Sequence, residues 1–434
     1  MKFPGQRKSK HFFPVESRDP LMSELSPQNK PISTHICGID QVLVDIEAHV
    51  PEGFLEKYGL SKGHSMVISP EKAEAIYKEL VDKGLIVSEF AGGTIGNTLH
   101  NYSVLSDDKS ILFGVMSEQI KVGSSAYRYL CNTSSKVDLN HLQPVPGSIG
   151  QCITLIAPDG ERSFAINKGE MDHLSPDYVD KKLVQGAAAL VVTAYLMRCE
   201  EHEPMKAAAL QAVAWAKEAG VPVVLTMGTK FIVEDRRDWW QDFIRDNVTV
   251  VAMNEDEAEA LTGLADPLLA VEQVLEWTDL VLCTAGPVGL YLGSHVDEAQ
   301  KRETNSQLLP GAIPEFNRYE YSRPMRREDC ENPIKVYSHI SPYMGGPERI
   351  KNTNGAGDGA LAALLHDMAA NGYHKLNVPG SSKHHADYLT YSSLSQVSKY
   401  ANRVSYEVLV QHSPRLSRGL PEREDSLEEV YWDQ

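Results

Sequence analysis

Cysteine is scarce in this chain, and the residues present are too scattered to form a site. There are six in 434 residues, with no Cys-x-x-Cys pair and no spacing typical of a zinc site: Cys37, Cys131, Cys152, Cys199, Cys283 and Cys330. This pattern excludes a disulfide framework and a zinc ribbon, and it favours reduced thiols. The sequence therefore predicts a cytoplasmic protein.

Long apolar runs and an excess of positive charge are also missing. No stretch approaches the length of a membrane span, so no membrane association is predicted. The formal net charge of −17 argues against nucleic-acid binding, which needs a basic surface. One glycine-rich pocket is enough for a nucleotide, so nucleotide binding is not excluded. The basic extreme N-terminus is not followed by a signal-peptide core, which favours a solvated arm over residues 1–34.

The most informative segment present is Asn352–Asp358, a glycine-rich turn that runs into the apolar stretch Ala360–Leu365. The N–H groups of Gly355, Ala356 and Gly357 at a helix N-terminus would bind phosphate oxygens. Asp358 adds a carboxylate where anions bind. Its function could be to complement the helix dipole or to accept a proton from an attacking hydroxyl, and the glycine context favours the base. The segment thus predicts phosphoryl transfer to an alcohol.

A second glycine element, Gly92–Asn97, lies between the apolar residues Leu85–Val87 and a helical pattern. Adjacent glycines permit close approach of another molecule to the backbone, and Asn97 can donate and accept hydrogen bonds. Taken alone, the element is equally compatible with a plain tight turn.

Strand-like and helix-like segments alternate through most of the chain, which predicts an α/β fold with a mostly parallel central sheet. Buried strands are expected at 188–193, 221–226, 248–253 and 280–284, and helices at 205–219, 255–262 and 268–277. Residues 151–166 differ, because an Asp-Gly turn between two alternating runs predicts a β-hairpin.

Together these elements resemble the ribokinase-like (PfkB-type) family of carbohydrate and nucleoside kinases. The resemblance implies a three-layer sandwich with a small β-sheet lid over the sugar site. It implies that Gly93, Thr94 and Asn97 contact the sugar, and that Gly38–Asp45 forms the first strand, whose closing Asp45 binds sugar hydroxyls. Asp40, on the same strand, could point into that site; an ordinary strand aspartate is the alternative for both.

The resemblance also implies a nucleotide site. Thr284, Ala285, Gly286 and Gly289 match the nucleotide loop, and Asn402 matches a position that flanks the ATP base. Asn254 and Glu257 match the element associated with Mg²⁺ through water, although Glu257 could simply lie on a solvated helix face. Asn352 stands where the family usually has aspartate, so a K⁺ requirement is in doubt.

Within that family, the chain is most similar to the bacterial inosine-guanosine kinases, including its tail from Gly419 to Asp425. This resemblance implies transfer from ATP to the 5′-hydroxyl of guanosine and inosine. A sugar kinase for ribose or fructose and a non-catalytic nucleotide-binding regulator stay as alternatives, and a homodimer is left open. An arginine suits the two acceptors of a 6-oxopurine, and Arg198 follows a predicted strand, although a surface arginine paired with Glu200 or Glu201 is equally compatible.

The predicted domain organisation is one kinase domain, residues 35–411, with an acidic tail at 412–434. Its lid is expected at about 42–60 and 150–168. Polar, irregular insertions are expected at about 295–344 and 374–388, and the His384–His385 pair in the second favours a solvated loop over a metal site.

Overall fold

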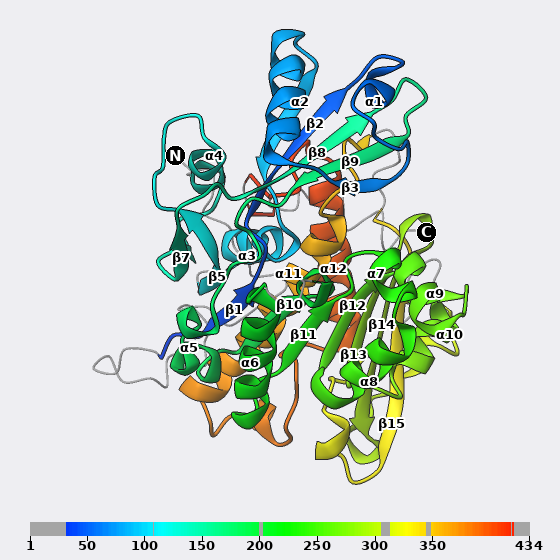
Figure 1. Ribbon diagram of the computed structural model, residues 1–434. Coiled ribbons are helices and arrows are strands. Elements are labelled where there is room, and N and C mark those ends of the chain that lie inside the picture. The colour runs from blue at the N-terminus through cyan, green and yellow to red at the C-terminus, as the bar shows by residue number, and fades with distance from the viewer. Residues whose placement is uncertain are drawn as a thin grey trace, which may run out of the picture.

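The structure is a computed structural model that describes residues 32–106, 108–198, 203–304, 313–343, 349–417 and 419–420. Most of the predicted N-terminal arm and C-terminal tail therefore lies outside the described residues. The described chain forms one large sheet, one small sheet and the helices that cover them (Figure 1). No helix within these ranges is long and apolar enough to cross a membrane.

The large sheet contains ten strands and confirms the predicted α/β fold. All its pairings are parallel except those of β14 with its two neighbours. Nine strands lie in the order β15 (Pro333–Ile340), β14 (Gly289–Asp297), β13 (Leu280–Ala285), β12 (Val250–Asn254), β11 (Val223–Thr226), β10 (Ala189–Thr193), β1 (His35–Ile39), β5 (Lys109–Ser117) and β6 (Val137–Asp138), while β7 (Leu142–Val145) pairs with β5.

Helices cover both faces of the large sheet because its central strands are apolar on both sides. In β10, Ala189 and Val191 belong to one hydrophobic core, whereas Leu190 and Val192 belong to the other. The first core packs under α3 (Thr94–Leu105), α11 (Ala356–Asn377) and α12 (Leu394–Leu409). The second packs under α5 (Lys181–Gln185), α6 (Met205–Glu218), α8 (Arg237–Asn247), α9 (Glu255–Thr262) and α10 (Pro267–Val274), with the short α7 (Lys230–Glu234) beside α9.

The small sheet forms a lid above the ends of the strands of the large sheet (Figure 1). Its strands lie in the order β3 (Ser65–Val67), β9 (Arg162–Asn167), β8 (Gly150–Ile156), β2 (Leu43–His49) and β4 (Ile86–Ala91), accompanied by α1 (Phe54–Lys57), α2 (Pro70–Asp82) and α4 (Ser125–Cys131). The predicted hairpin is confirmed, since β8 and β9 pair antiparallel around Gly160, whose φ is 87°. The predicted first lid segment, 42–60, was too short, because β3 and β4 extend it to residue 91.

The predicted single strand Gly38–Asp45 is wrong. The chain leaves the large sheet after Ile39, turns through Asp40–Val42 and enters the lid as β2. Asp45 consequently lies within a lid strand rather than at the end of a strand of the large sheet. The sequence does not mark this change of sheet, because apolar residues stand directly on both sides of it: Ile39 before it and Val42 to Val44 after it.

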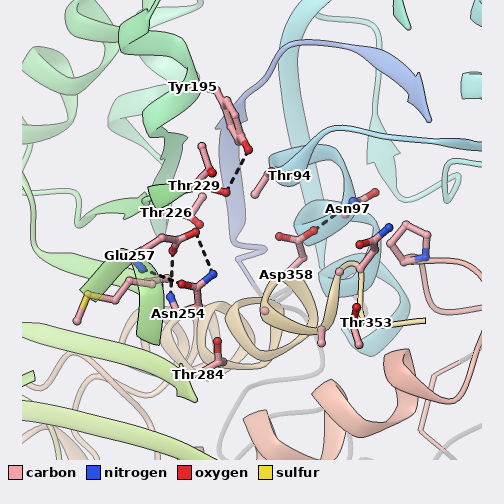
Figure 2. A pocket seen from close by; sticks show the side chains of 18 of the residues that line it. Thr94, Asn97, Tyr195, Thr226, Thr229, Asn254, Glu257, Thr284, Thr353 and Asp358 are labelled. Atoms are coloured by element: carbon pink, nitrogen blue, oxygen red, sulfur yellow. Dashed lines mark hydrogen bonds between the residues drawn. The ribbon is translucent and has the colours of Figure 1, made fainter. Parts of the chain in front are cut away.

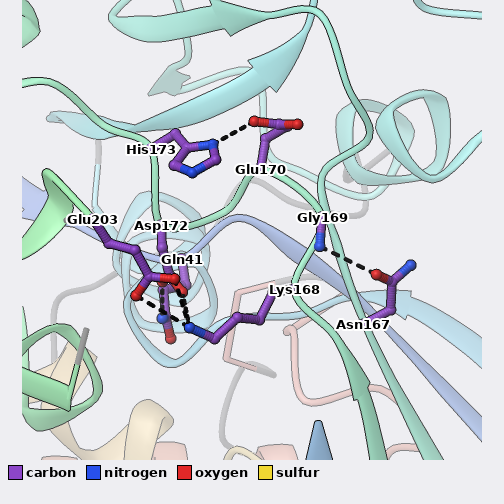
Figure 3. Close-up of polar contacts among 8 residues, drawn as sticks. All are labelled: Gln41, Asn167, Lys168, Gly169, Glu170, Asp172, His173 and Glu203. Atoms are coloured by element: carbon purple, nitrogen blue, oxygen red, sulfur yellow. Dashed lines mark hydrogen bonds and ion pairs between the residues drawn. The ribbon is translucent and has the colours of Figure 1, made fainter. Parts of the chain in front are cut away.

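Polar contacts join the lid to the large sheet where the two connect (Figure 3). Lys168, just beyond β9, pairs with Asp172 and with Glu203, each at 2.8 Å. The side-chain amide of Gln41 donates to the same Asp172. Gln41 precedes β2 and Lys168 follows β9. The network therefore links two of the segments through which the chain passes between the large sheet and the lid.

The described parts of the two predicted insertions are not simply irregular. In the first, β15 pairs with β14 as an edge strand and includes the run predicted to be extended, 334–337. In the second, α11 continues to Asn377, and His384 lies 2.6 Å from the buried His374. The solvated-loop prediction for His384 is therefore wrong, while His385 is exposed as predicted.

The boundary predicted at residue 411 falls too early. Arg415 and Leu416 are buried against the domain, with 3% and 2% of their surfaces exposed. The segment Ser413–Leu416 therefore belongs to the folded domain and not to a solvated tail.

Candidate active site

A cavity of about 1590 Å³ lies between the lid and the carboxyl ends of the large sheet's strands. This is the position where ligands bind in open α/β sheets. It is lined by the following residues singled out from the sequence: Asp40, Asp45, Gly93, Thr94, Asn97, Arg198, Asn254, Glu257, Thr284, Gly286, Gly289, Gly355, Ala356, Gly357, Asp358 and Asn402. Two other residues singled out from the sequence, Ala285 at the end of β13 and Asn352, are buried and do not line the cavity. The fold thus brings together segments from the whole chain.

The glycine-rich turn opens α11 at the cavity wall. Gly355, with φ of 78°, precedes the helix, and Asp358 is its third residue. The first N–H groups of a helix have no carbonyl partner within it, so those of Ala356 and Gly357 are available to an anion. The positive end of the dipole of this 22-residue helix faces the same place.

Asp358 faces Asn97 across the cavity (Figure 2). The Asn97 side-chain nitrogen donates to Asp358 Oδ2 at 3.1 Å. Burial, as the largest effect, raises the pKa of Asp358 to about 7; the Asn97 hydrogen bond opposes this rise and the charge of Asp45 adds to it. A carboxyl group with a pKa near neutrality is well matched to general-base catalysis.

The two adjacent glycines make room for two carboxylates. A Cβ on Gly92 would lie 2.3 Å from Asp45 Oδ2, and one on Gly93 would lie 2.4 Å from Asp40 Oδ2. Asp40 already accepts hydrogen bonds from the N–H groups of Gly96, at 2.7 Å, and Gln41, at 2.9 Å. Asp40 thus fixes the start of α3, a role that the sequence did not indicate.

The backbone of Asp45 pairs with β4 and β8, but its side chain makes no hydrogen bond with any other residue that the structure describes. Burial raises its pKa to about 6, and Arg415 opposes that rise. Both carboxylate oxygens of Asp45 are therefore available to hydroxyl groups of a ligand in the cavity.

Asn254 and Glu257 form a capping box at the start of α9. The Asn254 N–H donates to Glu257 Oε2 at 2.9 Å, and the Glu257 N–H donates to Asn254 Oδ1 at 2.8 Å. Glu257 is only 5% exposed, so the solvated-helix alternative is wrong. Burial raises its pKa to about 7, with Asp358 contributing. Within the described ranges, no cluster of three or more His, Cys, Asp or Glu side chains is placed to hold a metal.

The segment expected to bind nucleotide follows β13 and opens onto the cavity. Gly289 has a φ of 116°, and a Cβ there would lie 2.1 Å from the carbonyl oxygen of Ile340. Asn402, on α12, donates from its side chain to the Ser341 carbonyl at 2.9 Å, which holds its amide at the cavity wall.

Arg198 ends the short 3₁₀ helix Ala194–Arg198 that follows β10. It is exposed at the cavity, and its guanidinium lies over the Tyr195 ring, 5.2 Å from the ring centroid. Tyr195 is held by a 3.1 Å hydrogen bond from its hydroxyl to the Gly228 carbonyl. Glu200 and Glu201 lie outside the described residues, so the surface-pair alternative stays a prediction.

Asn352 is buried and bridges two loops. Its Oδ1 accepts from the Asn354 N–H at 2.9 Å, and its Nδ2 donates to the His412 carbonyl at 2.9 Å. An aspartate could make the first contact but not the second, because an ionised carboxylate has no hydrogen to donate.

Sequence reasoning missed two arginines that contact residues lining the cavity. Arg162, at the start of β9, donates to Asn354 Oδ1 at 3.2 Å and so joins the lid to the glycine-rich turn. Its position directly after the Asp-Gly turn of a lid hairpin was a usable signal. Arg415 donates to Asn97 Oδ1 at 2.9 Å. No local pattern marks Arg415, because it follows the last helix in a stretch that reads as tail.

Comparison with known proteins agrees with this geometry. The model of the pfkB family of carbohydrate kinases matches residues 61–306, more than half of the chain. The guanosine-inosine kinase of Escherichia coli K12 is 63% identical over 433 residues, covering 100% of both chains.

Solved structures share the fold at lower identity. Adenosine kinase from Sinorhizobium meliloti superposes with a TM-score of 0.62 at 20% identity, over 88% of this chain and 96% of that one. A probable sugar kinase from Rhizobium etli CFN 42 has a TM-score of 0.64 at 18% identity, over 92% and 97%. The predicted ribokinase-like fold is confirmed, and the chain is a member of the pfkB family of carbohydrate kinases.

Proposed function

We propose that this protein is an ATP-dependent purine nucleoside kinase that phosphorylates the 5′-hydroxyl of guanosine and inosine to form GMP and IMP. The observation that carries the proposal is the position of Asp358, a buried carboxylate at the N-terminus of α11 beside an anion-binding turn. The 63% identity over the full length of the E. coli guanosine-inosine kinase supports the choice of nucleosides.

Asp358 is the general base in this proposal. It accepts the proton of the 5′-hydroxyl as that oxygen attacks the γ-phosphorus of ATP, and the bond to the β,γ-bridging oxygen breaks to release ADP. The N–H groups of Gly355, Ala356 and Gly357 donate to the γ-phosphate oxygens and stabilise the charge of the transition state. The Arg162 guanidinium lies on the lid side, held at Asn354 and paired with Glu47 at 3.7 Å.

The nucleoside lies beneath the lid. Asp45 accepts hydrogen bonds from the ribose hydroxyls, and the same part of the cavity is lined by Gly93, Thr94 and Asn97. Asp40 contributes less to ribose binding than Asp45, since its oxygens already accept from two backbone N–H groups. Arg198 donates to O6 and N7 of the purine.

ATP lies along Thr284–Gly289 and reaches Asn402. A volume of about 1590 Å³ exceeds the range of roughly 300–1,000 Å³ typical of single-ligand pockets, which suits two substrates bound together. Ala285 acts only through its backbone, because its side chain is buried.

A hydrated Mg²⁺ fits beside Glu257 and Asn254. Glu257 is a buried carboxylate at the cavity wall, and it makes no ion pair with any described lysine or arginine. Through water, Glu257 and the Asn254 amide would hold the ion, which would supply positive charge to the β- and γ-phosphates. For K⁺, the Asn352 amide supports the opposite proposal, that no monovalent cation is needed, because its N–H already makes the link to the His412 carbonyl. We also propose a cytoplasmic location, which the use of ATP supports.

A sugar kinase acting on ribose or fructose is the second candidate, favoured by the fold similarity to a probable sugar kinase. The 63% identical relative weighs against it. The third hypothesis, a non-catalytic nucleotide-binding regulator, is disfavoured because Asp358 retains the pKa and position that a base requires.

Parallel assays of ADP formation with guanosine, inosine, adenosine, ribose and fructose test the proposal. We expect turnover with guanosine and inosine and the appearance of their 5′-monophosphates. Preferred turnover of ribose or fructose would establish the sugar kinase instead. ATP binding without turnover of any acceptor would favour the regulator.

A further inference from the structure

Arg415 is a buried cation whose position is set by α3. The Asn101 side chain holds the segment on both sides, donating to the Pro414 carbonyl at 3.1 Å and accepting from the Leu416 N–H at 2.7 Å. His100 lies 3.0 Å from the Leu416 carbonyl oxygen. These contacts place an arginine from the end of the domain next to Asn97 on the same helix.

All three guanidinium nitrogens of Arg415 are used, and all their acceptors are neutral. Nε donates to Asn97 Oδ1 at 2.9 Å, Nη1 to Thr133 Oγ1 at 2.7 Å, and Nη2 to the Gly92 carbonyl at 3.1 Å. Within the described chain, Arg415 makes no salt bridge, although only 3% of it is exposed. Burying a charge without an ion-pair partner is costly, and here that cost places a fixed positive charge beside the site.

The absence of a side chain at Gly96 lets the guanidinium approach α3. A Cβ there would lie 2.8 Å from Arg415 Nη2 and 2.6 Å from the Tyr129 hydroxyl oxygen. On the other side of Gly96, its N–H donates to Asp40. Gly96 therefore does more than permit the turn. Its backbone lies between the Asp40 carboxylate and the Arg415 guanidinium, and a larger residue would not fit there.

Arg415 determines which way the Asn97 amide faces. A guanidinium has only N–H donors, so Asn97 must present its oxygen to Arg415 and its nitrogen to the other side. That other side is Asp358, which accepts from the nitrogen at 3.1 Å. Asn97 can thus only donate to Asp358, and a donated hydrogen bond favours the ionised carboxylate.

We propose that Arg415 is a positioning residue for phosphoryl transfer: through Asn97 it orients Asp358, and its buried charge keeps that carboxylate ready to accept a proton. This inference rests on the proposed role of Asp358 as the base. It adds a residue that contacts neither the reacting hydroxyl nor the γ-phosphate.

The charge of Arg415 acts on three of the carboxylates of the site, Asp40, Asp45 and Asp358. Burial raises the pKa of Asp40 to about 7, of Asp45 to about 6 and of Asp358 to about 7, and in each case Arg415 opposes the rise. The titratable groups that face Asp358 or Arg415 from the surrounding elements are Asp40, Asp45, His100, Tyr129, Tyr195 and Glu257.

The test is the pH dependence of kcat/KM for the nucleoside, measured on the full-length enzyme with saturating ATP. Arg415→Met and Arg415→Gln remove the charge, whereas Arg415→Lys keeps it but cannot reproduce the three-nitrogen contact. Arg323→Met is the matched control, because Arg323 is also buried and donates to neutral acceptors, but those acceptors, Thr390, Lys383 and Asn371, do not line the cavity as Asn97 does.

We expect both neutral variants to move the acidic limb of the kcat/KM profile to higher pH by about one unit. The loss of kcat/KM relative to the parent should then be about tenfold greater at pH values below the limb than at pH values above it. Arg415→Lys should lower kcat with the limb unmoved, and the control should leave the limb unmoved. If Arg415→Met does not fold, Arg415→Gln decides the outcome.

A uniform loss at every pH in the neutral variants would overturn the inference and leave Arg415 a structural residue. A parent enzyme without an acidic limb, or without kinase activity, would instead overturn the base assignment or the proposed function.

Discussion

Asn97 and Asp358 are 261 residues apart in the chain, yet the Asn97 amide donates to Asp358 Oδ2 at 3.1 Å inside the cavity. The contact joins the two glycine elements of the sequence: one contributes the amide from α3, the other the carboxylate from α11. Because α3 and α11 pack against each other on the same face of the sheet, the distance between these side chains is fixed by the hydrophobic core beneath them.

Replacing Asp358 with asparagine should remove the proton acceptor while preserving the side-chain shape. We expect kcat to fall by roughly 10²–10⁴-fold, the range for a lost general base, with little change in ATP affinity. Steady-state kinetics and calorimetric titration with ATP measure the two quantities. Asp367→Asn is the control, since Asp367 is a buried carboxylate on the same helix that does not line the cavity. Turnover of Asp358→Asn within a few-fold of the parent would disprove the assignment.

The same two variants make a prediction about stability and pH. Burial raises the folded-state pKa of Asp358 from 3.8 to about 7 and that of Asp367 to about 6. A raised pKa means that the stability of the folded state declines as pH rises from the unfolded pKa through the folded one. The difference in melting temperature between each asparagine variant and the parent should therefore increase with pH, from about pH 4 to about pH 7 for Asp358→Asn and from about pH 4 to about pH 6 for Asp367→Asn, by on the order of 2 °C for a chain of this size. Differential scanning calorimetry tests this, and a constant difference across these ranges would contradict it.

Asp45 should distinguish ribosides from deoxyribosides. Hydrogen bonds to a charged group are worth about 1.5–3 kcal/mol, so losing one should make 2′-deoxyguanosine roughly 10- to 100-fold poorer in kcat/KM. In Asp45→Asn, both substrates should be weakened and this ratio should shrink. Equal kcat/KM values of the parent enzyme for guanosine and 2′-deoxyguanosine would remove Asp45 from the ribose site.

Arg198 should recognise the 6-oxopurine base by donating hydrogen bonds to its O6 and N7 atoms. Arg198→Ala is expected to reduce kcat/KM for guanosine and inosine alike, by about 10-fold or more, and to narrow the preference over adenosine, because adenine presents a donor where the arginine needs an acceptor. The affinity for ATP should not change. Arg236→Ala is the matched control: Arg236 also lines the cavity, but it is held on Trp239 and on the Met197 carbonyl. An unchanged guanosine-to-adenosine ratio in Arg198→Ala would refute the role.

Because of Asn352, the kcat of the enzyme should not depend on monovalent cations. We expect similar kcat in K⁺ and in tetramethylammonium, because the Asn352 amide already donates to the His412 carbonyl. Asn352→Asp places a carboxylate against that carbonyl oxygen, so kcat should fall by about tenfold or more, and K⁺ should restore part of it by bridging the two oxygens. A parent enzyme that requires K⁺ would show that the amide does not replace the ion.

The sequence alone was sufficient where the signal is local. The start of α11, the β8–β9 hairpin and the bounds of α9 follow from a glycine before a helix, an Asp-Gly turn and a capping box, each of which acts over a few residues. For the same reason, the neighbouring residues are enough to single out Asp358, whereas Glu257 was identified through the family resemblance.

Only the tertiary structure decided which of these elements meet. The change of sheet between Ile39 and Leu43 depends on the partners of each strand: β1 pairs with β5 and β10, whereas β2 pairs with β4 and β8. Arg415 lies 318 residues from the Asn97 oxygen that it contacts. The residues around Arg415 do not encode that contact. It arises because α3, α11 and α12 pack in one core, and this packing brings the segment that follows α12 next to Asn97 on α3.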